Sequence, residues 1–231
     1  MDAQNWLDGF TEEEIKGLSK TIDEWTTKKH EQKQIEVWWK GVWGRKYCYS
    51  PSNIIDPNTR VDGWKILVGE LPIKRILEVG CNRGHNLTAL SKIGNYDLYG
   101  IEPYNLALDK AKETNCPATL VEGNAFDIPF PDSYFDLVFT CAVLMHIESK
   151  YLPKAISEII RVSKKYILTI EYYSESVAFE FTVKNCGIES ISFRDYTNSF
   201  PNLLEHGKMR NDPRFEDFDK TGKLAYWLFE K

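Results

Sequence analysis

The sequence predicts an α/β fold: a doubly wound, Rossmann-like sheet of seven strands with an N-terminal helical cap. Three observations predict it. Short apolar runs alternate with amphipathic helical segments between residues 75 and 171, two more strand-like runs follow, and six of the seven tryptophans lie in the first 64 residues. At 231 residues and 42% hydrophobic side chains, the chain can form one sizeable domain. We divide it into a cap, residues 1–70, and a core, residues 71–231.

The cap is expected to be mainly helical. Residues 11–40 begin with a capping-box-like Thr-Glu-Glu-Glu segment and carry apolar side chains at helical spacing. Turn signals predict a loop over residues 44–60, and a short helix around Trp64 should lead to Pro72. We expect most of the tryptophans to pack the cap on the sheet, and Trp39, Trp43 and Tyr47 to be the candidates for ligand contact. The six tryptophans are Trp6, Trp25, Trp38, Trp39, Trp43 and Trp64.

Between residues 75 and 171 the core should consist of parallel strands with helices on both faces, because strand-like and helix-like segments alternate strictly there; beyond residue 172 the pattern is looser. Predicted strands are residues 75–80, 96–102, 118–122, 135–141, 165–171, 203–209 and 224–230. Predicted helices are residues 84–93, 106–114, 152–162 and 195–200.

Composition and charge exclude several classes of function. The net charge of -5 disfavours nucleic-acid binding. No apolar run approaches the ~20 residues of a membrane helix, and the acidic first 20 residues do not resemble a signal peptide, so we expect a cytoplasmic protein without membrane contact. The five cysteines and four histidines are too dispersed to predict a metal site.

The turn after the first core strand, Glu78–Asn86, contains the strongest local signal. Gly80 and Gly84 let the backbone turn tightly against a ligand, and Asn82 tolerates positive φ better than most residues. The spacing is not the G-x-G-x-x-G of dinucleotide-binding proteins. Glu78 would repel a pyrophosphate but suits an ammonium or sulfonium group, which favours S-adenosylmethionine over NAD.

Further candidates follow the next strands, where open parallel sheets bind ligands. Glu102 ends the second strand, and its carboxylate could accept both hydroxyls of a ribose. Asn124 could pair with an adenine edge, and Phe126 or Ile128 could cover the adenine face. Each of these residues alone could equally be structural.

Together these segments resemble class I S-adenosylmethionine-dependent methyltransferases over about residues 72–171. A narrower resemblance is to small methylases associated with pseudaminic acid biosynthesis. The stretches that carry it are Trp39-Lys-Gly-Val-Trp-Gly-Arg-Lys-Tyr47, Glu78-Val-Gly-Cys-Asn-Arg-Gly-His-Asn-Leu87, Tyr166-Ile-Leu-Thr-Ile-Glu-Tyr-Tyr173, Phe193-Arg-Asp195 and Trp227-Leu-Phe-Glu-Lys231.

The resemblance implies a set of cofactor contacts. Gly80, Asn82 and Gly84 would frame the methionine part of S-adenosylmethionine, and Glu78 would contact its amino group directly or through a water. Glu102 would bind the ribose, and Asn124, Ala125 and Phe126 would bind the adenine. Cys141 would line the site near the sulfonium, and Tyr47 would belong to a segment that folds across the cofactor. A small buried residue at a strand end is the alternative for Cys141.

Methyl transfer requires alignment of a nucleophile and, for a hydroxyl acceptor, removal of a proton. His146, Glu171, Tyr172 and Tyr173 lie just past the fourth and fifth strands and are the candidates for this step. Structural hydrogen bonding by His146 and simple packing of the tyrosines remain open. Arg194 and Asp195 are expected to form an internal ion pair.

The predicted function is methyl transfer from S-adenosylmethionine to a hydroxyl or amine of a small polar acceptor, such as a sugar, nucleotide-sugar or glycan intermediate, with S-adenosylhomocysteine as product. Two alternatives remain: methylation of a protein side chain or amino terminus, and a non-catalytic S-adenosylmethionine-binding module. The Asn/Asp-Pro-Pro-Tyr/Phe segment of DNA adenine methyltransferases is absent after the fourth strand, where Cys141-Ala-Val-Leu144 stands. We expect a monomer or homodimer.

Overall fold

A computed structural model describes residues 54–173, 179–183, 189–209, 212–216, 218–219 and 222–231, together with Gly44, Cys48 and Tyr49. The predicted helix over residues 11–40, the tryptophans before Trp64, and Tyr47 lie outside the described residues. The division of the chain at residue 70 stays a prediction.

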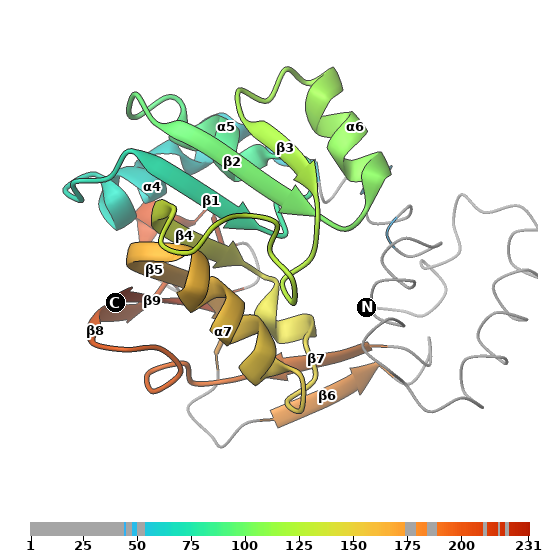
Figure 1. The fold of residues 1–231 in the computed structure, drawn as a ribbon, viewed down its shortest axis with the longest axis vertical. Helices are drawn as coiled ribbons and strands as arrows, with labels where there is room; N and C mark the ends of the chain where they lie inside the picture. Colours follow the sequence, from blue (N-terminus) through green and yellow to red (C-terminus); the bar gives the residue numbers. More distant parts are fainter. Residues whose placement is uncertain are drawn as a thin grey trace, which may run out of the picture.

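Seven strands form one mixed sheet in the order β3-β2-β1-β4-β5-β9-β8, which confirms the predicted seven-stranded fold (Figure 1). The strands are β1 Arg75–Val79, β2 Asp97–Glu102, β3 Thr119–Glu122, β4 Phe135–Cys141, β5 Ser163–Tyr172, β8 Leu203–Lys208 and β9 Leu224–Glu230. The first five strands pair in parallel, while β9 is antiparallel to both β5 and β8. The chain order reverses between β1 and β4, which is where such sheets open to a ligand.

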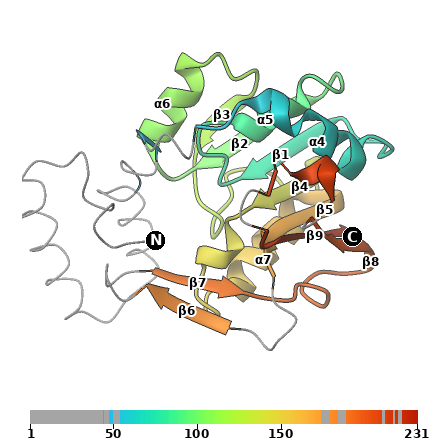
Figure 2. The ribbon, with the colours of Figure 1, turned by 180° about the vertical axis from the view of Figure 1, so that it is seen from behind.

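Helices cover both faces of the sheet because its central strands are buried on both sides. The α-helices are α4 Val61–Val68, α5 His85–Leu90, α6 Asn105–Glu113 and α7 Leu152–Val162, and the 3-10 helices are η3 Pro57–Arg60, η4 Leu144–His146 and η5 Pro213–Phe215. Helix α7 covers one face (Figure 1), and α4 and α5 cover the other (Figure 2). In β1, Ile76 joins the apolar cluster of α4 and α5, whereas Leu77 joins the cluster of α7.

Trp64 is fully buried in the cluster beneath α4. Its ring makes edge-to-face contacts with Phe139 at 4.7 Å and with Phe218 at 5.5 Å between centroids. Trp64 therefore packs its helix on the sheet, as expected for the tryptophans of this part of the chain.

The helix predicted over residues 195–200 is wrong. Asp195 Oδ1 instead accepts a hydrogen bond from the backbone N–H of Thr197 at 2.9 Å, and this Asx turn competes with helical hydrogen bonding. The predicted ion pair of Arg194 and Asp195 is replaced by other contacts. The guanidinium of Arg194 donates instead to the backbone carbonyls of Leu144 and Ile147.

Several elements were not anticipated. The strands β6 Phe179–Val183 and β7 Glu189–Phe193 form a separate antiparallel pair beside η4. In the expected loop over residues 44–60, Gly44, Cys48 and Tyr49 have helical backbone, and η3 is opened by Asp56, whose side chain accepts from the N–H of Asn58.

Candidate active site

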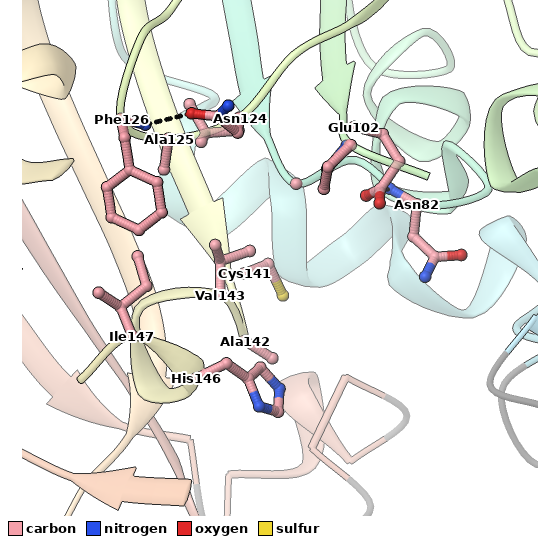
Figure 3. Close-up of a pocket in the computed structure, with 13 residues that line it drawn as sticks. Asn82, Glu102, Asn124, Ala125, Phe126, Cys141, Ala142, Val143, His146 and Ile147 are labelled. Carbon is pink, nitrogen blue, oxygen red and sulfur yellow. Dashed lines mark hydrogen bonds between the residues drawn. The ribbon is translucent and has the colours of Figure 1, made fainter. Parts of the chain in front are cut away.

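A cavity lies at the carboxyl ends of β1, β2 and β4. Its walls come from the loops that follow four strands, and Figure 3 shows Asn82 with Glu102, Asn124 with Phe126, and His146 on three different sides. The lining residues are Val79, Gly80, Asn82, Glu102, Pro103, Asn124, Ala125, Phe126, Cys141, Ala142, Val143, His146 and Ile147.

The loop after β1 passes close to the cavity because its backbone adopts left-handed conformations. Gly80 has φ 76°, Asn82 φ 46° and Gly84 φ 70°. A Cβ on Gly80 would lie 2.5 Å from a methyl carbon of Val143, so only glycine fits between the loops after β1 and β4. Gly80 and Asn82 line the cavity, whereas Gly84 precedes α5 and faces Cys116, where a Cβ would lie 2.5 Å from the thiol sulfur.

Glu102 ends β2 and is buried, with its carboxylate held by backbone donors. Oε2 accepts from the N–H of Asn82 at 2.9 Å, and Oε1 accepts from the N–H of Tyr104 at 3.2 Å. Burial raises the pKa of Glu102 to about 7, against the opposing effect of these two hydrogen bonds. The carboxylate is therefore fixed at the cavity wall and titrates near neutral pH.

Glu78 lies behind the cavity and does not line it. The residue is only 2% exposed, and Oε1 accepts from the side-chain amide of Asn86 at 2.7 Å. Arg60 in turn donates to the side-chain oxygen of Asn86. Burial is the main cause that raises the pKa of Glu78 to about 8. Among the described residues, Glu78 Oε2 has no hydrogen-bond partner.

The loop after β3 supplies Asn124, Ala125 and Phe126 to the cavity wall. Asn124 Oδ1 accepts from the backbone N–H of Phe126 at 2.8 Å and of Asp127 at 3.2 Å, which closes an Asx turn (Figure 3). This turn places the three residues side by side in the cavity wall.

The loop after β4 forms the remaining wall. Cys141 ends the strand, and burial raises the pKa of its thiol to about 11, so it lines the cavity as a neutral group. His146 follows on η4 and also lines the cavity. Five further lining residues were not singled out from the sequence: Val79, Pro103, Ala142, Val143 and Ile147. Val79 is the last residue of β1, and Pro103, Ala142 and Val143 directly follow the ends of β2 and β4, which was an available signal.

The other proposed catalytic residues do not reach the cavity. Glu171 is fully buried, and its carboxylate accepts from Thr140 and from backbone N–H groups of residues 143–145. The ring of Tyr172 packs against Phe193 at 5.2 Å between centroids, and Tyr173 packs against Trp227 at 5.6 Å. Of the candidates for proton transfer, His146 is therefore the one placed in the cavity wall.

Two searches concern only the part of the chain that the structure describes. There, no three histidine, cysteine or acidic side chains are grouped so that they could hold a metal ion. None of the helices in that part has the length and apolarity needed to cross a bilayer.

Comparison with known proteins agrees with this geometry. Residues 77–166 match the family described as "Methyltransferase domain". An uncharacterized methyltransferase of Schizosaccharomyces pombe is 35% identical over 104 residues, which cover 39% of this chain and 36% of the relative. The 24-methylenesterol C-methyltransferase 2 of Oryza sativa is 23% identical over 215 residues, covering 80% of this chain and 59% of the relative. The aligned parts thus span less than two thirds of these relatives.

A solved structure shares the fold over most of the chain. It is the 1,6-didemethyltoxoflavin-N1-methyltransferase of Burkholderia thailandensis with bound 1,6-didemethyltoxoflavin and S-adenosylhomocysteine, with a TM-score of 0.67 and 10% identity, covering 89% of this chain and 92% of that one. The strand order is that of the class I S-adenosylmethionine-dependent methyltransferase fold, and residues 77–166, which match a methyltransferase domain, contribute most of the cavity wall.

Proposed function

We propose that the protein transfers a methyl group from S-adenosylmethionine to a hydroxyl or amine of a small polar acceptor, such as a sugar, nucleotide-sugar or glycan intermediate. One observation carries the proposal: the carboxylate of Glu102, at the end of β2, and the imidazole of His146, on η4, line the same cavity from different sides. A ribose-binding acid on one side and a proton acceptor on another are what methyl transfer to a hydroxyl requires.

The residues present fit S-adenosylmethionine. The backbone turn at Gly80, which a Cβ would obstruct, leaves room for the methionine part beside Asn82. Glu102 would accept hydrogen bonds from the ribose hydroxyls, and Asn124, Ala125 and Phe126 would hold the adenine. Glu78 acts from behind this wall, and a contact with the amino group of the cofactor would require an intervening water or a shift of its side chain.

The cofactor supplies a methyl group already activated by a sulfonium. His146 would take the proton of an acceptor hydroxyl as that oxygen forms its bond to the methyl carbon, while the pair of electrons of the carbon–sulfur bond remains on sulfur as S-adenosylhomocysteine forms. Alignment of the acceptor in the cavity would supply much of the remaining rate enhancement.

The choice of acceptor rests on resemblance and on the polar side chain of His146. The narrower resemblance to methylases of pseudaminic acid biosynthesis supports a sugar acceptor. A protein acceptor and a non-catalytic S-adenosylmethionine-binding module are the alternatives, and the Oryza sativa relative, named a sterol C-methyltransferase, represents a carbon acceptor.

The test uses methyl-tritiated S-adenosylmethionine and a cell extract. Label in the polar small-molecule fraction supports the proposal; label in protein or in an organic extract assigns the protein or the apolar carbon acceptor instead. His146→Gln should abolish most of the transfer while S-adenosylhomocysteine still binds. His206→Gln, on the exposed face of β8, is the matched control that should retain the activity. Binding of the cofactor with no labelled product in any extract would favour the non-catalytic module.

A further inference from the structure

We propose that Glu171 and Arg194 are positioning residues. They bind the loop after β4 from two sides and thereby fix the position of His146 in the cavity wall. The inference rests on the proposed role of His146. Neither Glu171 of β5 nor Arg194 after β7 lines the cavity, so each would act on the reaction through the loop that carries His146.

Glu171 holds the N–H side of the loop. Its two carboxylate oxygens accept from the backbone N–H groups of Val143, Leu144 and Met145 at 3.1–3.2 Å. Oε1 also accepts from the hydroxyl of Thr140 at 2.8 Å. Three successive N–H groups that converge on one anion form a backbone nest, and they include the first donors of η4, which have no acceptor within that helix.

The burial of Glu171 makes these contacts consequential. The side chain is fully buried, and burial raises its pKa, while the hydrogen bonds from the loop and from Thr140 act in the opposite direction. A buried carboxylate is tolerated only where donors replace its lost water. The donors here belong almost entirely to the loop that carries His146, so the carboxylate and the loop fix each other.

Arg194 holds the carbonyl side. Its guanidinium donates through Nη1 to the carbonyl of Leu144 at 2.9 Å, and through Nη2 to the carbonyl of Ile147 at 2.8 Å and the hydroxyl of Ser149 at 3.1 Å. The planar fork of arginine can span these acceptors, which lysine could not. Leu144 is thus held by Glu171 at its N–H and by Arg194 at its carbonyl, two positions before His146.

The loop needs such support because its own structure is weak. Helix η4 has three residues, too few to be stable without tertiary contacts. Ala142 has φ 57°, a left-handed backbone conformation that is unfavourable for residues other than glycine. Both the weak helix and the strained alanine belong to the segment that lines the cavity.

The segments that carry Glu171 and Arg194 are also hydrogen-bonded to each other. The backbone N–H of Arg194 donates to the carbonyl of Tyr172 at 3.1 Å, next to Glu171 in β5. The end of β5 and the segment after β7 therefore form one frame around the loop. Because a misplacement of about 1 Å can reduce turnover by ~10²-fold, this frame can affect the reaction without touching the acceptor.

The first test measures the loop directly in the full-length protein. Amide hydrogen exchange at Val143, Leu144 and Met145 should accelerate at least ~10-fold in Glu171→Gln, because the amide side chain has one acceptor oxygen and no charge. Glu205→Gln, an exposed acid on β8, is the control that should leave exchange at these amides unchanged. Unchanged exchange in Glu171→Gln would overturn the inference.

The second test asks whether Glu171 acts through His146, with labelled methyl transfer to an extract fraction as the readout. Glu171→Gln should reduce turnover ~10²-fold in the wild-type background and less than ~3-fold further in His146→Gln, since a displaced and an absent imidazole are equivalent. If the two losses of turnover multiply in the double variant, Glu171 does not act through His146. That result would overturn the inference but leave the proposed role of His146 as the base unaffected. Full turnover in His146→Gln alone would overturn the proposed role of His146 and the inference with it.

Arg194→Lys provides an independent variant if Glu171→Gln does not fold. It should accelerate exchange in the same loop and show the same dependence on His146. Arg214→Lys, whose exposed side chain pairs with Asp212, is its matched control. Wild-type exchange in a folded Arg194→Lys variant would contradict the role of the arginine.

Discussion

The backbone N–H of Asn82 donates a hydrogen bond to Oε2 of Glu102 over 2.9 Å. This contact joins the loop after β1 to the end of β2, so the two sides of the proposed cofactor site are held at a fixed separation. The same carboxylate is buried, and its remaining acceptor capacity is available to hydroxyl groups of a ligand in the cavity.

Loss of the Glu102 charge should weaken cofactor binding. In Glu102→Gln the hydrogen bonds to the ribose lose their charge assistance, which corresponds to roughly tenfold or more in affinity. Isothermal titration with S-adenosylhomocysteine measures this change. Glu113→Gln, an exposed acid at the end of α6, should bind like the wild type. Equal affinities of Glu102→Gln and the wild type would show that Glu102 does not hold the ligand.

Affinity for S-adenosylhomocysteine should depend on pH through Glu102. Because the pKa of Glu102 is about 7 in the unliganded protein, the fraction of molecules with an ionised Glu102 carboxylate decreases as pH falls below that value. The affinity should then fall, approaching a tenfold loss for each further pH unit, and Glu102→Gln should lack this component. Titrations between pH 5.5 and 8, as a rough range around this pKa, check the prediction. A component of the same size in Glu102→Gln would assign it to another group.

Stability of the unliganded protein should decrease between mildly acidic and mildly alkaline pH. Glu78 has an ordinary pKa of 4.5, which burial raises to about 8 in the folded protein. Between these values the folded state keeps a proton that the unfolded chain has released, so each rise in pH favours unfolding. The stability contribution of the protonated group is complete below 4.5 and is lost as pH rises through this window.

The Glu78→Gln variant isolates this effect. Glutamine can still accept the hydrogen bond from Asn86 but does not titrate, so the decline in melting temperature with pH should be shallower than in the wild type. Thermal unfolding in a series of buffers measures both slopes, with Glu113→Gln as the control. Parallel curves for Glu78→Gln and the wild type would contradict the prediction.

Removal of the Trp64 ring should destabilise the fold without touching the cavity. The ring is fully buried between Phe139 and Phe218, and a Trp→Ala change in such a place costs about 3–5 kcal/mol in the free energy of unfolding. Chemical denaturation of Trp64→Ala and Trp64→Phe should show a large and a smaller loss. A loss below about 1 kcal/mol in Trp64→Ala would mean that the ring is not part of the core.

The sequence supported prediction of the core strands because their apolar runs match buried parallel strands, as in β4 and β5. It also located residues of the cavity wall, since Glu102 ends β2 and His146 follows the end of β4, and these strand ends share one edge of the sheet. These inferences needed only local pattern and the general topology of open parallel sheets.

The assignment of Glu171 to the cavity exceeded what the sequence could support. An acid that ends an apolar strand needs a partner, but the sequence does not show whether that partner is a substrate or the backbone of another loop. Here the backbone N–H groups of residues 143–145 are the partner, and backbone donors leave no signature in the sequence. The turn at Asp195 was missed for a related reason, because its side chain forms a local hydrogen bond that overrides helical propensity.

A crystal structure of the protein with S-adenosylhomocysteine would locate the cofactor site directly. We expect the ribose hydroxyls at about 2.5–3.0 Å from the carboxylate oxygens of Glu102, the adenine beside Phe126, and the sulfur on the side of Cys141 that faces His146. A ligand bound outside this cavity, or a ribose without contact to Glu102, would contradict this expectation.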